Sequence, residues 1–449
     1  MRLNGALDIQ PGAIVSFVGA GGKTAALFRL ACELVEQGFR VLTTTTTRFA
    51  QDELQHAPYC IALGDSDELP ASLHDDLETH RHVLLYHHLT PDNKAQGVSA
   101  AWVDQHLAGL PFVDILLIEA DGSRRLPIKA PLAHEPPVPA SSTLVIPVVG
   151  LSALDQPLDD THVYGVEIMQ KALGCVPGEP ITEAIIAGFV THPELGLKNV
   201  PDRARVIPLL NQATEAFLPR ARAIAGLALK SPRIARVLIG SVQDDNPILE
   251  AQRRVGAVIL AAGQSKRMGQ PKLLLPWGDS TIIRRTVEQI AAAGLAEIVV
   301  VAGEWADRIR EQVADLPARV VVNPEYATGE MLSSLKVGLN ALGGECDACL
   351  VALGDQPMLE FSVTWRVLDA YARGEGRIVA PSYQNQRGHP LLIDRAYWQA
   401  ILDLPPGKAP RDVLRANEQA IAYVVVDTDS ALVDIDTPED YERARKKGG

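Results

Sequence analysis

The stretch VGAVILAAGQSKRMGQPKLLLPWG (residues 255–278) places an apolar strand directly before a loop that contains glycines, a serine, an arginine and lysines. In open parallel sheets, ligands bind beyond the carboxyl ends of the strands, where loops and helix N-termini offer backbone N–H groups to anions. Gly263 and Gly269 allow the backbone to approach phosphate groups closely, and Arg267 and Lys272 supply positive charge there. The alternative is a glycine turn with solvated basic side chains, because such turns are common in α/β proteins.

Strand-like and helix-like stretches alternate along the whole chain, as they do in βα units around a mostly parallel sheet. One series of apolar runs ends at IARVLIGSV, and a second series begins at Val255. Between them lies QDDNPILEAQRR (243–254), which is polar and contains a proline. We therefore expect an α/β protein of two domains, 1–240 and 255–449, joined by a linker at 241–254. Each domain is expected to contain a mostly parallel sheet flanked by helices.

The chain of 449 residues has 47% apolar and 22% charged residues, a mean hydropathy of +0.05 and a net charge of −13. This composition is typical of a soluble globular protein, and the length favours two domains. The acidic balance disfavours a nucleic-acid partner, because binding to phosphate backbones requires an excess of lysine and arginine. No apolar segment is long enough to cross a bilayer and the N-terminus lacks the apolar core of a signal peptide, so we expect a cytoplasmic protein without a membrane partner.

The five cysteines predict reduced thiols in such a compartment. Cys346 and Cys349 form the only C-x-x-C pair and stand at the entry to an apolar strand. No second pair completes four metal ligands, so packing in the core is the preferred interpretation of these two residues.

Two further motifs of the second domain contain carboxylates at positions suited to a cation. LVALGDQP is a predicted strand followed by Asp355, and a carboxylate at the carboxyl end of a strand can hold a cation beside phosphates. DIDTPEDY contains Asp434 and Asp436 before a helix whose N-cap is Thr437. Capping explains the residues from Thr437 onward but not the two aspartates before it, for which a solvated turn is the alternative.

Taken together, LAAGQSKRMGQPK, GDQP, RGHPLLI and DIDTPEDY resemble the molybdenum cofactor nucleotidyltransferases (MobA-like NTP transferases), and most of all their cytidylyltransferase branch. The resemblance covers nearly all of 255–445 and implies a Rossmann-like nucleotidyltransferase domain. It implies that Arg267 and Lys272 bind phosphates and act in catalysis with Asp355. It also implies a Mg²⁺ site at Asp355, with Asp436 as a second ligand. Residues implied to wrap the nucleotide or line the cleft for the nucleotide and pterin are Ala261, Ala262, Gly263, Asn323, Gly329, Ser333, Ser334, Arg387, Gly388 and His389.

This resemblance implies a reaction in which the terminal phosphate of Mo-molybdopterin attacks the α-phosphorus of CTP and pyrophosphate leaves. No protein nucleophile is required, and His389 is expected to position substrate rather than to act as an acid or base. The sequence Leu260-Ala261-Ala262-Gly263 matches the L-A-A-G of cytidylyltransferases rather than the L-A-G-G of guanylyltransferases. The alternatives are a guanylyltransferase or another nucleotidyltransferase of the same fold, and a non-catalytic chaperone that carries the cofactor.

In the first domain, FVGAGGKTA (17–25) ends a predicted strand and opens a helix, and its Gly22, Lys23 and Thr24 match the end of a phosphate-binding P-loop. The motif departs from the full pattern, whose first glycine falls at Phe17, so we expect a remodelled loop. In this interpretation Lys23 contacts phosphates and Thr24 a magnesium ion. A glycine turn leading into a capped helix is the alternative.

VDILLIEADGS ends in Glu119 and Asp121, which suits a carboxylate beside a nucleotide-bound metal, and we expect Asp121 to share that metal with Thr24. With IKAPLAHEPPVP, these motifs resemble the accessory proteins of selenium-dependent molybdenum hydroxylases (YqeC-like) over about 1–240. The resemblance implies a second NTP site and a client molybdenum hydroxylase as partner, but no particular reaction. Where P-loop GTPases carry N-K-x-D, this chain has Asn211-Gln212-Ala213-Thr214, which argues against specificity for guanine.

Overall fold

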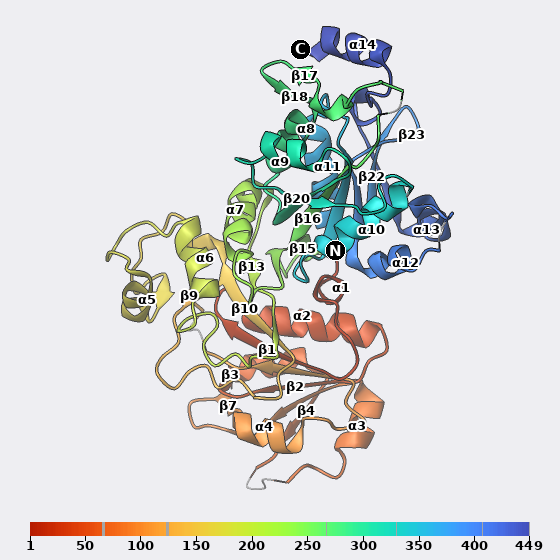
Figure 1. Cartoon of the computed structure of the whole chain (residues 1–449). Helices are drawn as coiled ribbons and strands as arrows, with labels where there is room; N and C mark the ends of the chain where they lie inside the picture. Colours follow the sequence, from red (N-terminus) through yellow and green to blue (C-terminus); the bar gives the residue numbers. More distant parts are fainter. Residues whose placement is uncertain (65–67, 123–124, 266, 329, 406, 449) are drawn as a thin grey trace. The chain divides into compact units, whose positions relative to one another are not determined.

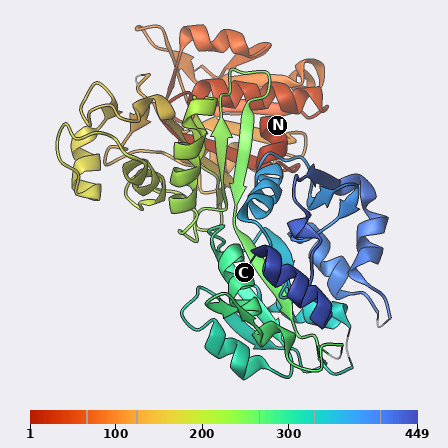
Figure 2. The same cartoon turned by 90° about the horizontal axis from the view of Figure 1, so that it is seen from above.

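The computed structural model describes residues 1–449 except 65–67, 123–124, 266, 329, 406 and 449. The chain divides into two compact units, 1–252 and 253–449. Each unit contains a sheet whose strands are mostly parallel and whose faces are covered by helices, as Figure 1 and Figure 2 show. The predicted α/β class with two domains of this kind is confirmed.

The main sheet of the first unit has the strand order β15-β14-β13-β10-β1-β8-β2-β5-β4, with β12 beside β10. The strands from β14 to β4 run parallel. They comprise β1 (Ala13–Gly19), β2 (Val41–Thr45), β4 (Tyr59–Ala62), β5 (His82–Tyr86), β8 (Ile115–Glu119), β10 (Leu144–Gly150), β12 (Arg205–Val206), β13 (Leu209–Asn211), β14 (Arg236–Gly240) and β15 (Ile248–Arg253). The helices are α1 (Leu3–Leu7), α2 (Lys23–Glu36), α3 (Leu73–His80), α4 (Ala100–His106), α5 (Val166–Leu173), α6 (Glu183–Thr191) and α7 (Leu218–Ala228).

Successive residues of β1 pack on opposite faces of this sheet, because side chains alternate along a strand. Val15 and Phe17 belong to the core beneath α2, whereas Ile14 and Val18 belong to the core beneath α3 and α4. Burial on both faces explains why the strand reads as a continuous apolar run. Smaller strands lie outside the main sheet: β3 (Arg48–Ala50), β6 (His88–Leu89), β7 (Lys94–Gln96), β9 (Ile128–Lys129) and β11 (Val163–Tyr164).

The stretch expected to be a linker, 241–254, contains a strand. β15 pairs with β14 at the edge of the first unit's sheet. The strand was not predicted because it contains the charged residue Glu250. This residue is fully buried and accepts hydrogen bonds from the Arg222 guanidinium at 2.5 and 2.9 Å. A buried carboxylate with a bidentate arginine partner is compatible with a strand, although it does not read as one in the sequence.

The second unit is built on the strand order β20-β19-β16-β21-β24-β22-β23, with β25 beside β22. β16 lies parallel to β19 and β21, whereas β24 is antiparallel to both of its neighbours. The strands are β16 (Val255–Ala261), β19 (Glu297–Ala302), β20 (Arg319–Val322), β21 (Ala348–Leu353), β22 (Ile378–Tyr383), β23 (Gln386–Arg387), β24 (Leu391–Asp394) and β25 (Ile421–Val425), and a separate hairpin joins β17 (Pro276–Trp277) to β18 (Ser280–Thr281).

Helices cover both faces of this second sheet (Figure 1). α8 and α11 pack on one face with Ala257 and Ile259 of β16, whereas α10, α12 and α13 pack on the other face with Val258. The helices are α8 (Ile282–Ala291), α9 (Ala306–Gln312), α10 (Met331–Ala341), α11 (Phe361–Ala372), α12 (Trp398–Leu402), α13 (Pro410–Ala416) and α14 (Pro438–Gly448). Because the central strands are parallel, their carboxyl ends lie at one edge of the sheet, as expected for a ligand site.

Cys346 and Cys349 are buried free thiols in the core around α10, as the sequence predicted. Burial raises the pKa of Cys346 to about 11, so this thiol stays protonated at neutral pH. In the part of the chain that the structure describes, every helix is too short or too polar to span a lipid bilayer.

Candidate functional site

The carboxyl ends of β16 and β21 open into a cavity of about 570 Å³. The loop after β16 forms one wall and the turn after β21, which contains Asp355, forms another. Of the residues predicted for the nucleotide and metal, the cavity is lined by Ala261, Ala262, Gly263, Arg267, Lys272, Ser334, Asp355 and Asp436. The structure therefore brings together residues that lie far apart in the sequence.

Three carboxylates form a cluster in this cavity: Asp355, Asp434 and Asp436 each offer an oxygen, and these oxygens lie within 4.8 Å of one another. The buried Ile435 donates its backbone N–H to the Asp355 carbonyl at 3.1 Å, which fixes the segment 434–436 beside the end of β21. Hard carboxylate oxygens at this spacing suit Mg²⁺. Burial and the neighbouring Asp355 raise the pKa of Asp434, so the cluster favours a cation that would offset its negative charge.

Asp434 was noted in the sequence but was not predicted as a metal ligand. It joins the cluster because the apolar residue between the two aspartates is buried, and both carboxylates line the same cavity. The signal in the sequence was the Asp-Ile-Asp spacing itself, in which a single core residue separates two acids.

Lys272 provides the positive charge that the cluster holds in the structure. Its Nζ donates to Asp355 Oδ2 at 2.5 Å and to Asp436 Oδ1 at 2.9 Å. Burial by itself lowers the pKa of Lys272, but Asp355 and Asp436 outweigh it and the net shift is upward. Lys272 is therefore a protonated ammonium at neutral pH, positioned among the carboxylates.

Arg267 also reaches this cluster, but from solvent. Its guanidinium donates to Asp436 Oδ2 at 3.1 Å, and its side chain is 75% exposed. An exposed arginine on a glycine-containing loop can turn toward a phosphate at little cost, because a surface ion pair contributes little stability. Arg267 and Lys272 thus approach the same carboxylates with different degrees of burial.

Asn323 and Ser333 do not line the cavity, whereas Ser334 does. The Asn323 side chain donates to Ser333 Oγ at 2.9 Å and to Ser334 Oγ at 3.0 Å, and accepts from the backbone N–H of Glu325 at 2.9 Å. The buried asparagine consequently holds the start of α10 in place and acts on the site through Ser334. Gly329 lies outside the residues that the structure describes.

Arg387, Gly388 and His389 line a second cavity of about 230 Å³, which shares Leu260, Glu330 and Met331 with the first. The two cavities are therefore neighbours. Gly388 passes close to another segment: a Cβ there would collide with the carbonyl oxygen of Ala431. Burial, helped by the nearby Arg387, lowers the pKa of His389 to about 4, so its imidazole is neutral under ordinary conditions.

In the first unit, Gly22, Lys23 and Thr24 form the junction between β1 and α2. Thr24 Oγ1 donates to Glu119 Oε2 at 2.6 Å, and Lys23 Nζ donates to the carbonyl oxygen of Gly19 at 2.7 Å. Glu119 is the last residue of β8, the strand next to β1. Burial raises the pKa of Glu119 to about 7. A threonine at the start of the helix is thereby joined to a carboxylate on the adjacent strand.

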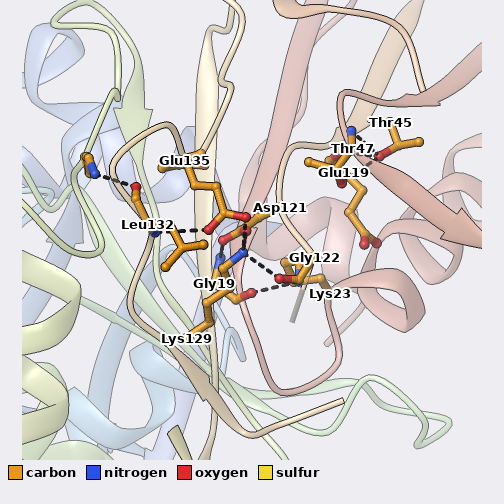
Figure 3. Close-up of polar contacts among 12 residues, drawn as sticks. Gly19, Lys23, Thr45, Thr47, Glu119, Asp121, Gly122, Lys129, Leu132 and Glu135 are labelled. Atoms are coloured by element: carbon orange, nitrogen blue, oxygen red, sulfur yellow. Dashed lines mark hydrogen bonds and ion pairs between the residues drawn. The ribbon is translucent and has the colours of Figure 1, made fainter. Parts of the chain in front are cut away.

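Asp121, predicted to share a metal with Thr24, has other partners. Its carboxylate pairs with the fully buried Lys129, and its second oxygen accepts the backbone N–H of Gly19 at 3.2 Å. Lys129 also donates to Glu135 at 2.9 Å, and Figure 3 shows Asp121, Lys129 and Glu135 pointing toward one another. The structure thus joins Thr24 to Glu119, whereas the two oxygens of Asp121 bind Lys129 and the Gly19 N–H.

Asn211 lies directly behind the same loop. Its Nδ2 donates to the carbonyl oxygen of Gly21 at 2.8 Å, and its Oδ1 accepts the backbone N–H of Val242 at 3.0 Å. Both ends of this buried amide are used within the protein, so Asn211 supports the loop and does not read a nucleotide base.

Two family models match the chain: the YqeC protein at residues 15–167 and the MobA-like NTP transferase domain at residues 257–421. The uncharacterized protein YqeC of Escherichia coli K12 is 32% identical over 231 residues, which cover 51% of this chain and 88% of that protein. The molybdenum cofactor cytidylyltransferase of the same organism is 28% identical over 194 residues, covering 43% of this chain and 96% of that protein. Nicotine blue oxidoreductase of Paenarthrobacter nicotinovorans is 33% identical over 198 residues, covering 42% of this chain and 95% of that protein.

Proposed function

Since this chain joins a YqeC domain to a MobA-like NTP transferase domain, we propose that its second unit transfers CMP from CTP to Mo-molybdopterin and releases pyrophosphate. The observation that carries the proposal is the position of Lys272 and three aspartates in one cavity at the carboxyl ends of parallel strands. A metal-dependent reaction of a nucleoside triphosphate needs this combination of ammonium and carboxylates, because charge must be neutralised on several phosphates at once.

In this reaction the terminal phosphate of the acceptor attacks the α-phosphorus of CTP, and the bond from that phosphorus to the β-phosphate bridging oxygen breaks. The electron pair of that bond leaves with pyrophosphate. Lys272 and Arg267 stabilise the charge that grows on the leaving group, and the loop after β16 holds the phosphates in line. Asp355, Asp434 and Asp436 would hold a Mg²⁺ ion, which would supply further neutralisation of the phosphate charges when bound.

The second cavity is suited to the pterin acceptor. Its floor is apolar, with Leu335, Val351 and Leu391, and its rim includes Arg387 and Arg411. A flat heterocycle can pack on such a floor while a guanidinium binds its phosphate. Because this cavity shares Leu260, Glu330 and Met331 with the first, an acceptor bound in it would lie beside the nucleotide cavity.

The neutral His389 yields a prediction about pH. A group whose pKa is about 4 gains its proton only below that value, so His389 neither gains nor loses charge between pH 5.5 and 8.5. We expect the ratio of kcat/KM between His389→Gln and the native chain to be constant over this range. A ratio that changes between pH 6 and 7, the range in which an ordinary histidine titrates, would show instead that His389 acts as an acid or base.

We expect the nucleotide base to be cytosine. Ala262 lies in the loop that lines the nucleotide cavity, and we expect its methyl group to leave room for a pyrimidine and less room for a purine. With CTP and GTP at equal concentration and Mo-molybdopterin as acceptor, mass spectrometry should find mainly the cytosine dinucleotide. Ala262→Gly should lower the preference for CTP over GTP by between about 10-fold and about 200-fold, because one methyl group contributes about 1–3 kcal/mol.

The same assay separates the rival functions. An excess of the guanine product would identify a guanylyltransferase. The relationship to nicotine blue oxidoreductase raises hydride transfer as a rival, which would consume a reduced cofactor and yield no dinucleotide.

Residues 253–449 expressed alone are expected to fold cooperatively and to retain nucleotidyl transfer. Both hydrophobic cores of this unit are composed of residues between Val255 and Ala444, so the fragment keeps its own interior. Circular dichroism during thermal unfolding should show a single transition, and released pyrophosphate measures activity. An insoluble or inactive fragment would indicate that the unit depends on residues 1–252.

A further inference from the structure

The junction between β1 and α2 contains a buried positive charge without a close counter-ion. Lys23 is 3% exposed, and its ammonium donates to the Gly19 carbonyl oxygen. Among the described residues, no carboxylate oxygen lies within 4.0 Å of the Lys23 Nζ, although an ammonium carries three donors. The carboxyl groups of Glu119 and Asp121 interact with Lys23 electrostatically, but the Gly19 carbonyl oxygen is the one hydrogen-bond acceptor that its ammonium has among the described residues. A ligand would supply acceptors for the remaining donors. This lysine is therefore complementary to an anion.

A buried carboxyl group lies close by. Glu119 is 4% exposed, and its Oε2 accepts the Thr24 hydroxyl, while its Oε1 has no hydrogen-bond partner within the described ranges. The carboxylate interacts electrostatically with Lys23 but makes no direct ion pair with it. A cation bound to Glu119 and Thr24 would satisfy the free oxygen. One ligand that combines an anion with a divalent cation would therefore satisfy both Lys23 and Glu119.

The backbone at this junction also offers unpaired donors. The N–H groups of Gly22, Lys23 and Thr24 have no hydrogen-bond acceptor in the part of the chain that the structure describes, and no side chain caps α2. The helix has 14 residues, so its N-terminus carries a partial positive charge toward the same point. Gly22 and Thr24 are half-buried, so this end of the helix lies at the surface of the unit.

The loop at residues 19–24 is held in one conformation by contacts within the protein that do not involve the ligand. Gly21 and Gly22 have φ of 76° and 112°, a region that favours glycine. A Cβ on Gly22 would collide with the Asn211 amide, and a Cβ on Gly21 would collide with the backbone of Gly150. On the other side, Asp121 binds the Gly19 N–H and is itself fixed by Lys129, as Figure 3 shows. A site preformed in this way loses little entropy when the ligand binds.

We propose that the first unit binds a nucleoside triphosphate together with Mg²⁺ at residues 19–24. Lys23 and the free N–H groups of the first turn of α2 bind phosphate oxygens, while Thr24 and Glu119 face the metal ion. Asp121 and Lys129 position the loop and do not contact the ligand. This binding site is additional to the cytidylyltransferase site of the second unit and does not depend on it.

The test uses the full chain with Lys272→Ala and Asp355→Asn, so that nucleotide bound by the second unit does not obscure the result. Isothermal titration calorimetry with Mg²⁺ and ATP, GTP, CTP or pyrophosphate measures affinity and stoichiometry. We expect one equivalent of at least one nucleoside triphosphate to bind more tightly than pyrophosphate. Adding Lys23→Ala should weaken binding at least about tenfold, as expected for the loss of a charged hydrogen bond. Lys171→Ala, which removes an exposed lysine from the same unit, should leave the affinity unchanged.

Thr24→Val and Glu119→Gln test the metal side separately. In both variants the ratio of the nucleotide affinity with Mg²⁺ to the affinity with EDTA should fall toward one. The affinity measured with EDTA should equal that of the chain without the substitution. Glu119→Gln keeps the shape of the side chain and removes its charge, so it remains informative if Lys23→Ala fails to fold. Absence of binding for all four probes, equal affinity in Lys23→Ala, or an unchanged effect of Mg²⁺ in both metal-side variants would each overturn the proposal. Pyrophosphate release by a chain carrying only Lys23→Ala reports on the second unit, so failure at one site is distinguishable from failure at the other.

Discussion

Asp355→Asn is expected to lower the rate of cytidylyl transfer by at least about 10²-fold while the fold remains intact, because the loss of one electrostatic stabiliser in an active site typically costs this much. Asp355 is the aspartate that connects the cluster to β21, through its backbone contact with Ile435 and its ion pair with Lys272. Asparagine keeps the volume and removes the charge. Initial rates of pyrophosphate release at saturating Mg²⁺ measure the effect.

Asp307→Asn serves as the matched control. This aspartate lies on α9 with a side chain that is 92% exposed, and it does not line the cavity. We expect its activity to equal that of the native chain. Near-native turnover in Asp355→Asn, with thermal unfolding unchanged in both variants, would remove Asp355 from the mechanism.

Lys272→Ala is expected to have an equally large effect on rate, about 10²–10³-fold, and an opposite effect on metal binding. The ammonium donates to Asp355 and Asp436, so it competes with a metal ion for the same oxygens. Without it, the three carboxylates repel one another more strongly and should bind Mn²⁺ more tightly. Electron paramagnetic resonance during titration with Mn²⁺ measures this affinity. The chains also carry Lys23→Ala, which weakens the proposed site of the first unit.

Arg267→Ala provides the comparison for Lys272→Ala. Its guanidinium reaches Asp436 from a largely exposed position, so we expect a loss of rate of only about tenfold and little change in metal affinity. Equal effects of the two substitutions on rate and metal affinity would contradict the competition between the Lys272 ammonium and a metal ion for the same oxygens. Weaker metal binding in Lys272→Ala would also contradict it.

The fold could be predicted where local patterns determine structure. The β16 strand and the loop after it follow from an apolar run, glycines and basic residues that are adjacent in the sequence. Asp355 could be placed for the same reason, since it follows a buried strand directly. Burial on both faces of the central strands gave continuous apolar runs in both units, which is the pattern of a parallel sheet.

Features that depend on distant residues could not be predicted. The contacts of Lys272 join it to carboxylates 83 and 164 residues away in the sequence, and no local pattern reveals which of three aspartates meet it. In the first unit, both Glu119 and Asp121 follow from the sequence as carboxylates at the end of a strand, and Asp121 was the one predicted to share a metal ion with Thr24. Lys129 is only 8 residues from Asp121 and pairs with it, whereas Thr24, which binds Glu119, is 95 residues away from Glu119 in the sequence.

β15 and Asn211 illustrate the same limit. The strand was hidden because Glu250 reads as a surface residue until Arg222 is known to pair with it. Asn211 stood where GTPases read guanine, but its amide is bound by the backbone at Gly21 and Val242. In each case a partner far away in the sequence decides what a polar residue does.

The most direct measurement quantifies pyrophosphate and dinucleotide in the same reaction, with the native chain, CTP, Mo-molybdopterin and Mg²⁺. If Lys272 and the three carboxylates carry out nucleotidyl transfer, the two products form in equal molar amounts, and neither forms when EDTA removes the metal. Pyrophosphate released without dinucleotide would indicate hydrolysis of CTP. Bound CTP recovered intact beside unmodified Mo-molybdopterin would indicate a carrier, and either result would contradict the proposed transfer.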